Sequence, residues 1–472
     1  MPFSKKPFTH RNNQHSSWRD YQSSLPKKFI REQRPQRRIS SRAIVVGLVA
    51  TALIAAFGLF SFLRNSAENS PPLMATTTAA VPTAIGQLNK EGIREFLDER
   101  AFSNLTEKDL SLPAAGSTLH VETTLNPDLQ NYLLDTIDRV NSRYVGIVVM
   151  EGASGRVLAL AGFDRTDSFG NPCLRSQFPA ASIFKIVTAA TAMDHCGYSA
   201  DSPMHYSGSK HTLYKRQLTD KVDRYTTTIP LREAFADSIN PVFGKLGELR
   251  LRKPLLEQAA ATFGFNQPLD FEVTVPPSQF QISDKPYNWA EVASGFNLGT
   301  TLSPLHGAAL ATAVLNGGRM VTPTIVERIA DEQGDVLYQR PETAEFRQIM
   351  SARAATALGQ MMEETITSGT ARKAFRKHQT DKILARLQIG GKTGSLDSSS
   401  HDVRYDWFVG FAKERHGNKK LVVAVMVGHE KFLGIRASDY ARRAMTYYFD
   451  APVAKRTASA GPYSSNPPLK GQ

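Results

Sequence analysis

The feature that most constrains this chain is an uncharged stretch of 21 residues near its N-terminus, at 43–63. A helix needs roughly 20 apolar residues to cross the hydrocarbon core of a membrane. The stretch is apolar all round and is bracketed by Arg42 and Arg64, which disfavours a buried core helix. The 42 residues before it disfavour a cleaved signal peptide. The sequence therefore predicts a retained transmembrane helix at 43–63.

The basic residues of the chain are concentrated before this stretch. Of a formal net charge of +13, residues 1–42 carry +9, from eleven Lys/Arg against Asp20 and Glu32. An excess of Lys and Arg marks the cytoplasmic side of a membrane span. We therefore expect residues 1–42 to be a cytoplasmic tail, and the rest of the chain to lie outside a cytoplasmic (inner) membrane that it crosses once. The charge then reports topology, and no nucleic-acid partner is expected.

Three further segments follow the predicted span. Residues 64–117 are expected to form an extracytoplasmic linker, rich in Pro, Ser and Thr at its start, with one short helical segment. Residues 118–450 hold the large domain, and residues 451–472 are expected to be a disordered tail. Only two cysteines occur, Cys173 and Cys196. The predicted compartment would permit a disulfide between them, and the sequence leaves their pairing open.

Strand-forming runs lie at both ends of the large domain. Residues 144–150 and 156–163 are joined by Gly-Ala-Ser-Gly, and residues 407–413 and 421–428 flank a His-Gly-Asn turn. Each pair predicts a hairpin. Most of the sequence between the hairpins reads as helices, so we expect a sheet with an inserted helical region.

One of these helices has clear ends. In the segment 303–316, Ser303 is a good N-cap, Pro304 takes the first helical position and Gly317 follows the last one. The pattern predicts a helix that begins and ends at these residues.

Another predicted helix begins with a reactive pair. In residues 179–193 a proline precedes a run of helix-forming residues, which places Ser182 at the helix N-terminus and Lys185 one turn later on the same face. Partial burial and nearby cations lower the pKa of a lysine, and a neutral amine can take the proton of a serine hydroxyl. The spacing therefore supplies a nucleophile and its base without a histidine.

The Ser-x-x-Lys pattern alone is weak evidence, because it occurs twice more. The copy at 24–27 lies in the predicted cytoplasmic tail and contains a proline, and the copy at 207–210 contains Gly208. Neither copy begins a predicted helix. Context therefore selects Ser182 and Lys185.

A Ser-x-Asn motif follows at Ser238 and Asn240. On a loop facing Ser182 across a cleft, these residues would offer a hydroxyl for proton relay and an amide for the peptide bond of a substrate.

A Lys-Thr-Gly motif follows at Lys392, Thr393 and Gly394, with Ser395 after it. On a strand, Gly394 would let a peptide lie against the strand edge and Lys392 would supply positive potential. The hydroxyls of Thr393 and Ser395 would then bind a terminal carboxylate.

With these three motifs in this order, the chain resembles the penicillin-binding protein and serine β-lactamase superfamily. The resemblance covers residues 118–450 and extends to TTLNPDLQ, TLSPLHGAALATAVLNGG, SGTARKAF and YDWFVGFA. It departs from the family pattern at Ala181 and Ile186, where many relatives carry Gly and Pro. It implies an α+β fold, an antiparallel five-stranded sheet flanked by helices with an inserted all-helical region, next to the single transmembrane helix.

The resemblance also implies the roles of the motif residues. The backbone N–H groups of Ser182 and Ser395 would form an oxyanion hole, and no metal or other cofactor is implied. The implied catalytic residues are Ser182, Lys185, Ser238, Asn240 and Lys392, and the implied substrate-binding residues are Thr393, Gly394 and Ser395.

The implied function is that of a peptidoglycan D,D-transpeptidase, which cross-links stem peptides through a Ser182 acyl-enzyme and is inhibited by β-lactams. Water in place of the acceptor amine would make it a D,D-carboxypeptidase. A β-lactamase of class A would need a Glu in an Asn-containing loop, and LDFEVTVPP at 269–277 lacks that box. A class D-like β-lactamase, with a carboxylated Lys185, and a non-catalytic β-lactam sensor or scaffold remain as alternatives.

The length of the segment between the predicted membrane helix and residue 118 indicates which partner protein the chain needs. The 54 residues of the linker are too few for the glycosyltransferase domain of bifunctional relatives, so a separate glycosyltransferase is expected. The N-terminal pedestal domain of long monofunctional relatives is also not expected, which leaves a role in elongation, division or an accessory process open.

Overall fold

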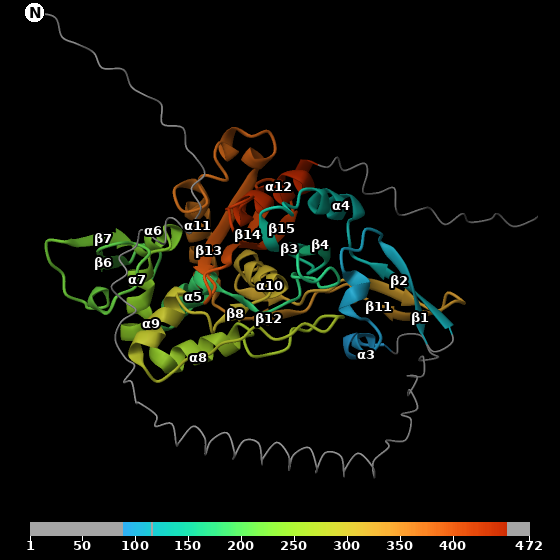
Figure 1. The fold of residues 1–472 in the computed structure, drawn as a ribbon, viewed down its shortest axis with the longest axis horizontal. Helices are drawn as coiled ribbons and strands as arrows, with labels where there is room; N and C mark the ends of the chain where they lie inside the picture. Colours follow the sequence, from blue (N-terminus) through green and yellow to red (C-terminus); the bar gives the residue numbers. More distant parts are fainter. Residues whose placement is uncertain (1–87, 115–116, 451–472) are drawn as a thin grey trace, which may run out of the picture. The chain divides into compact units, whose positions relative to one another are not determined.

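An antiparallel five-stranded sheet forms the centre of the folded unit (Figure 1). The computed structural model describes residues 88–114 and 117–450, which belong to a unit that begins at Pro82. The strand order β13-β14-β15-β3-β4 joins early and late parts of the sequence, because β15 pairs with β3. Both predicted hairpins, β3–β4 and β14–β15, are confirmed. The strands are β3 (Ser142–Glu151), β4 (Val157–Asp164), β13 (Leu387–Asp397), β14 (Arg404–Glu414) and β15 (Lys420–His429).

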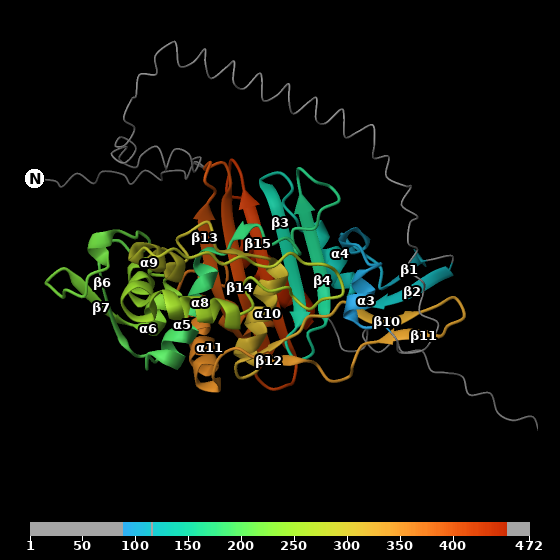
Figure 2. The same ribbon diagram turned by 90° about the horizontal axis from the view of Figure 1, so that it is seen from below.

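Helices cover both faces of this sheet. On one face, α4 (Pro127–Asp135) and α12 (Ala437–Asp450) share an apolar core with Val423 and Val425 of β15. Successive residues of a strand point to opposite faces, so Ala424 faces the other way. There it meets α10, where a methyl group placed on Gly307 would lie 3.5 Å from the Ala424 side chain. Figure 2 shows α10 against the sheet. Burial on both faces explains the nearly continuous apolar sequence of β15.

Helix α10 (Pro304–Leu315) has the ends that the sequence predicts. The Ser303 hydroxyl accepts a hydrogen bond from the His306 N–H at 3.1 Å, and Pro304 occupies the first position. Gly317, just past the end, has φ of +63°, a conformation that favours glycine.

The region between β4 and β13 contains strands as well as helices, so the expectation of an all-helical insertion is wrong. Its strands have only two to five residues each, too few for a period-2 pattern to be separated from a helix. They are β5 (Phe178–Pro179), β6 (Pro203–Ser207), β7 (Thr226–Pro230), β8 (Thr301–Leu302), β9 (Arg319–Val321), β10 (Val326–Ala330), β11 (Val336–Gln339) and β12 (Phe346–Gln348). The pairs are β5–β8, β6–β7, β9–β12 and β10–β11.

Apart from α10, the helices of this region gather beside β13 (Figure 1). They include the segments that carry the first two motifs. Besides α10, the α-helices are α5 (Lys185–His195), α6 (Leu231–Ala236), α7 (Asn240–Lys245), α8 (Arg252–Thr262), α9 (Pro286–Ser294) and α11 (Ala352–Thr367). Shorter turns are η2 (Ala181–Phe184), η3 (Lys215–Gln217), η4 (Leu246–Leu251), η5 (His378–Thr380) and η6 (Leu384–Arg386).

The folded unit includes residues that the sequence assigns to the linker. Within residues 88–114 the structure has α3 (Lys90–Arg94), η1 (Glu99–Phe102) and β1 (Asp109–Ala114). β1 pairs with β2 (Ser117–Thr123), and the two continue into β10 and β11 as a four-stranded sheet. The sheet places folded residues before the predicted start of the domain at Thr118.

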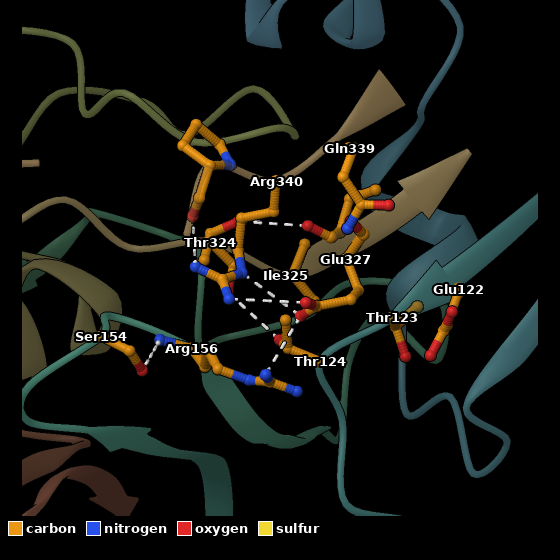
Figure 3. Close-up of polar contacts among 12 residues, drawn as sticks. Glu122, Thr123, Thr124, Ser154, Arg156, Thr324, Ile325, Glu327, Gln339 and Arg340 are labelled. Carbon is orange, nitrogen blue, oxygen red and sulfur yellow. Dashed lines mark hydrogen bonds and ion pairs between the residues drawn. The ribbon is translucent and has the colours of Figure 1, made fainter. Parts of the chain in front are cut away.

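A charged cluster links the four-stranded sheet to the five-stranded one (Figure 3). Glu327 of β10 accepts a hydrogen bond from the Arg340 Nε at 3.2 Å and lies 3.3 Å from the Arg156 Nη1. Arg156 directly precedes β4. The Thr124 hydroxyl, just after β2, donates to the Val157 carbonyl at 2.7 Å. These contacts fix β2 and β10 against the start of β4.

The two cysteines are free in the structure. Cys173 is buried and its thiol lies 3.4 Å from the Ala161 carbonyl, while Cys196 is partly exposed at the end of α5. Burial raises the pKa of the Cys173 thiol well above its ordinary value, so this thiol is kept protonated.

Some of the sequence predictions fall on residues that the structure does not describe. These are the cytoplasmic tail at 1–42, the membrane helix at 43–63, the start of the linker at 64–87 and the tail at 451–472. Among the helices within residues 88–114 and 117–450, none combines the length and the apolar composition that a membrane crossing requires.

Candidate active site

Ser182 lies on the short turn η2 that leads directly into α5. This confirms the predicted position at a helix start. Ala181, immediately before it, has φ of +48°, and such a conformation costs a non-glycine residue roughly 1–2 kcal/mol. The departure from Gly at this position therefore carries a backbone strain. The turn packs closely on Gly295, where a side chain would collide with the Ala181 carbonyl.

Lys185 is fully buried and reaches three oxygen atoms. Its Nζ lies 2.7 Å from the Ser182 Oγ, 2.7 Å from the Asn240 Oδ1 and 3.3 Å from the Ser238 Oγ. Burial lowers the pKa of Lys185 well below its usual range, and the nearby Lys392 lowers it further. A neutral amine has two N–H donors and one lone pair. If Asn240 and Ser238 take the donors, the lone pair faces the Ser182 hydroxyl.

Ser238 joins the two lysines of the site. Its hydroxyl, which Lys185 reaches from one side, accepts a hydrogen bond from the Lys392 Nζ at 2.9 Å. Lys392 is also fully buried, and its Nζ donates to the Thr393 carbonyl at 2.9 Å. Burial lowers the pKa of Lys392 to about 7, against a smaller opposing effect of the Asp237 carboxylate. The hydroxyl can therefore relay a proton between two amines that both lose protons easily.

Two aromatic rings form the apolar surroundings of these amines. The Lys185 Nζ lies 5.5 Å from the centre of the Phe243 ring, and the Lys392 Nζ lies 5.4 Å from that of Phe235. Both rings are fully buried and pack against each other. They exclude water and offer only a weak cation–π attraction. A carboxylate in their place would stabilise the charged amines, whereas the rings favour the neutral form.

The Lys-Thr-Gly motif lies on β13, at the edge of the five-stranded sheet. A methyl group placed on Gly394 would lie 3.3 Å from the Ser182 backbone nitrogen, so the glycine keeps the strand close to the nucleophile. The Thr393 hydroxyl contacts the Thr370 hydroxyl at 2.5 Å. An edge strand has backbone groups free to pair with an extended peptide.

A cavity continues from the end of this strand. Its volume is about 690 Å³, and its walls include Leu396 and Asp397 of β13 and the loop after α9 with Phe296 and Leu298. The last two side chains are 42% and 41% exposed, which is high for large apolar residues in a folded unit. The cavity is large enough for several residues of a peptide.

The sequence did not reveal the hydrogen bonds that hold the Ser395 side chain in place. The Ser395 hydroxyl donates to the Asp406 carboxylate at 3.4 Å, and Asp406 accepts two hydrogen bonds from Arg436, at 2.7 and 2.8 Å. Burial alone would raise the pKa of Asp406, but Arg436 and His429 lower it well below its usual range. Asp406 lies inside the YDWFVGFA segment, but no local pattern links it to Arg436. Only the pairing of β13 with β14 brings Ser395 and Asp406 together.

The structure brings all eight predicted site residues together. Five of them form one connected network through the two lysines and Ser238, and the other three follow on β13. The network residues are Ser182, Lys185, Ser238, Asn240 and Lys392. No cluster of His, Cys, Asp and Glu that could hold a metal ion occurs within residues 88–114 and 117–450.

Comparison with known proteins agrees with this geometry. Residues 145–447 match the family model of the penicillin-binding protein transpeptidase domain. The chain is 24% identical to stage V sporulation protein D of Bacillus subtilis, over 72% of this chain and 54% of the relative. It thus spans about half the length of that relative. It is 24% identical to peptidoglycan D,D-transpeptidase PbpA of Mycobacterium tuberculosis, over 79% of this chain and 80% of the relative.

Solved structures share the fold. The D,D-transpeptidase domain of a peptidoglycan glycosyltransferase from Eggerthella lenta has a TM-score of 0.57 at 23% identity, over 70% of this chain and 82% of that one. Penicillin-binding protein A of M. tuberculosis has a TM-score of 0.56 at 22% identity, over 70% of this chain and 80% of that one. With a family match over more than half of its length, the chain belongs to the penicillin-binding protein transpeptidase family.

Proposed function

We propose that this chain is a peptidoglycan D,D-transpeptidase and that Ser182 forms an acyl-enzyme with a stem peptide. The observation that carries the proposal is the 2.7 Å contact between the Ser182 Oγ and the Nζ of a fully buried lysine. Burial and a second lysine both lower the pKa of Lys185, which makes it a base. The match to the transpeptidase family and the similarity to PbpA support the reaction type.

In the acylation step, the Ser182 Oγ attacks the carbonyl carbon of the penultimate D-Ala while its proton passes to Lys185. The intermediate collapses by breaking the C–N bond to the terminal D-Ala. The departing nitrogen takes a proton from Lys185 through the Ser238 hydroxyl, which lies 3.3 Å from the amine. The products are free D-Ala, an ester on Ser182 and a neutral Lys185.

In the second step, an amine from a neighbouring stem attacks the ester. Lys185 accepts a proton from this amine, the ester C–O bond breaks, and the Ser182 oxygen recovers a proton. The product is a new peptide bond between two stems. Water in place of the amine would give a carboxypeptidase, so the acceptor decides between the two activities.

The β13 edge is suited to hold the donor stem as an added strand. The Asn240 amide oxygen and the Ser182 hydroxyl both contact the Lys185 amine. Lys392, Thr393 and Ser395 would bind the terminal carboxylate. Backbone N–H groups of Ser182 and Ser395 would stabilise the oxyanion, and one such donor is typically worth about 2.7–4 kcal/mol. The cavity beyond β13 would receive the rest of the stem.

We also propose that β-lactams acylate Ser182. Penicillin-binding protein A of M. tuberculosis has been solved as a penicillin G acyl-enzyme complex, and its TM-score to this chain is 0.54. A β-lactam presents a strained amide carbonyl and a carboxylate, the same two groups as the stem terminus. The shared fold and the network around Ser182 support the same adduct here.

A β-lactamase is less well supported, because it needs a base that activates water. The glutamate of the LDFEVTVPP segment, Glu272, is fully buried and its carboxylate accepts hydrogen bonds from the Thr324 hydroxyl at 2.5 Å and the Ile325 N–H at 3.1 Å. It also lies 3.8 Å from Lys90. These partners hold Glu272 in the contact between α3 and β10. Because Glu272 is engaged there, it does not serve as the base that activates water at Ser182, and we expect slow deacylation.

The location and partners are part of the proposal. Residues 43–63 would anchor the chain once in the cytoplasmic membrane, with residues 1–42 in the cytoplasm and the folded unit outside. The sequence supports this by its uncharged stretch and its basic tail. The glycan strands would be polymerised by a separate glycosyltransferase.

The reaction can be tested with the full-length chain and a diacylated peptide that ends in D-Ala-D-Ala. We expect wild type, and not Ser182→Ala, to release D-Ala and to form an exchange product when a D-amino acid is added as acceptor. Mass spectrometry separates exchange from hydrolysis. Hydrolysis alone at all acceptor concentrations would replace the transpeptidase by a carboxypeptidase, and turnover by Ser182→Ala would reject the nucleophile.

A further inference from the structure

We propose that Lys210 and His211 position the loop that carries Ser238 and Asn240. This inference rests on the proposed acylation of Ser182. Lys210 ends the Ser-x-x-Lys copy at 207–210 that has no place in the catalytic network. It lies three residues after β6, in the loop that connects β6 to β7. The hairpin of these two strands projects from the helical region (Figures 1 and 2).

The first contact is a backbone cap on α7. Asn240 begins this helix, and the preceding residue, Ile239, makes no side-chain cap. The first N–H groups of a helix lack partners within the helix. The Lys210 carbonyl accepts the Asn240 N–H at 2.7 Å. The hairpin therefore supplies the cap that the local sequence lacks.

The second contact sets the direction of the Asn240 amide. The His211 carbonyl can only accept, and it takes a hydrogen bond from the Asn240 Nδ2 at 3.0 Å. The Oδ1 is then left to accept from the Lys185 Nζ at 2.7 Å. A flipped amide would direct N–H groups at Lys185 and would compete for its lone pair. The His211 carbonyl thus keeps one amine proton of Lys185 occupied and the lone pair available to Ser182.

The third contact ties the other end of the loop. The Lys210 Nζ lies 2.5 Å from the Asp237 carboxylate, next to Ser238 in the sequence. Ser238 has φ of +55°, a conformation that persists only where the surroundings hold it. On the α6 side, the Ser238 N–H donates to the Phe235 carbonyl at 3.0 Å. The loop between β6 and β7 thus holds this segment at both ends, at Asp237 after α6 and at Asn240 at the start of α7.

The contacts predict an effect on chemistry rather than on folding. The Lys210 and Asp237 side chains are 41% and 28% exposed, and exposed ion pairs add little to stability. The Ser238 hydroxyl, however, must lie within reach of both Lys185 and Lys392, and a small misplacement of catalytic groups is costly. Loss of the tie should slow acylation without a matching loss of stability.

A graded series at one position tests this idea. We would measure acylation of the full-length chain by a fluorescent penicillin, separating the dissociation constant from the acylation rate constant. Lys210→Arg keeps the cation, and Lys210→Ala removes the ion pair. Lys210→Gly also removes the ion pair and makes the backbone that carries the capping carbonyl more flexible. Relative to wild type, we expect rate constants within about 2-fold, lower by about 3–10-fold, and lower by about 10–100-fold, respectively.

Lys221→Gly is the matched control, because Lys221 is exposed on the same hairpin loop. Its acylation rate constant should match wild type, and the melting temperatures of all variants should lie close together. Wild-type rate constants in Lys210→Ala and Lys210→Gly would overturn the positioning role. So would losses that follow the melting temperature or that Lys210→Arg fails to restore. An unlabelled wild type would instead reject the proposed function.

Discussion

The two buried charged sites along β13 and β14 are built on opposite principles. Asp406 of β14 is paired with Arg436, a cation that forms two hydrogen bonds to it. Three residues earlier on β13 than Ser395, Lys392 is buried close to a second lysine, and its hydrogen bonds go to a hydroxyl and a carbonyl. One site lowers the pKa of an acid by pairing it, and the other lowers the pKa of a base by leaving it without a carboxylate contact.

The difference indicates that the ion pair has a structural role and that the two buried lysines have a catalytic one. A buried ion pair keeps its charges and holds two elements together, here Asp406 on β14 and Arg436 just before α12. Two buried amines in an apolar site cannot both remain charged without cost. The free-energy cost of burying these two amines falls at the site where the proposed reaction transfers a proton. Perturbed bases of this kind are typical of catalytic sites.

The largest effect is expected from Lys185→Met. It removes the base, and positioned acid–base groups contribute about 10²–10⁴-fold to rates, so the acylation rate constant should fall by that factor. It also replaces a buried amine by an apolar side chain of similar length, so the melting temperature should rise. Stopped-flow acylation and thermal unfolding measure the two effects. Equal acylation in the variant would show that Lys185 is not the base.

The second prediction concerns the pH dependence of stability in Lys392→Met. The pKa of Lys392 falls from 10.5 in the unfolded chain to about 7 in the folded one. Between these values only the unfolded chain binds the proton, so the free energy of unfolding should rise with pH across this window and level off outside it. Lys392→Met should lose that part of the rise. Urea unfolding at pH values on both sides of the window checks it, and an unchanged slope would contradict the shifted pKa.

Asp406→Asn should destabilise the fold by about 2–3 kcal/mol, because it removes the charged partner of Arg436. The cost should stay below that of a fully buried pair, since the Arg436 side chain is 42% exposed. Acylation should fall only slightly, through the looser support of Ser395. Urea denaturation measures the free energy of unfolding. A neutral effect would mean that the pair is not a structural tie.

The smallest effect is expected from Glu327→Gln, in the cluster of Figure 3. Glu327 and Arg340 are partly buried, with side chains 18% and 13% exposed, so the loss should be about 1 kcal/mol. The acylation rate constant should not change, because none of the network residues contacts this cluster. A slower acylation would mean that the four-stranded sheet influences the active site.

The sequence predicted the parts of the fold that have strong local signals. The two hairpins were recognised from long apolar strands around short turns, and α10 from its cap, proline and glycine. The short strands of the inserted region were missed, because β6 and β10 have only five residues each, and β10 pairs with β2, which is distant in the sequence. The pairing of β1 with β2, which begins before residue 118, was also missed, although the two strands are neighbours in the sequence.

The candidate site shows the same division. Motif order identified Ser182, Lys185 and their partners, because each motif is a short local pattern. The contacts that hold them in place, such as the one to the Lys210 carbonyl in the loop between β6 and β7, use backbone carbonyls that any residue type can provide. The strain at Ala181 was also hidden, because φ cannot be read from an alanine in a sequence.

The proposed reaction depends on acylation of Ser182, which a buried amine activates. Incubating the full-length chain with benzylpenicillin and measuring its intact mass, followed by peptide mapping, tests this most directly. We expect one covalent adduct that maps to Ser182, persists for many minutes and is absent from Ser182→Ala. An adduct on another residue, or no adduct in wild type, would contradict it, and release within seconds would indicate a β-lactamase.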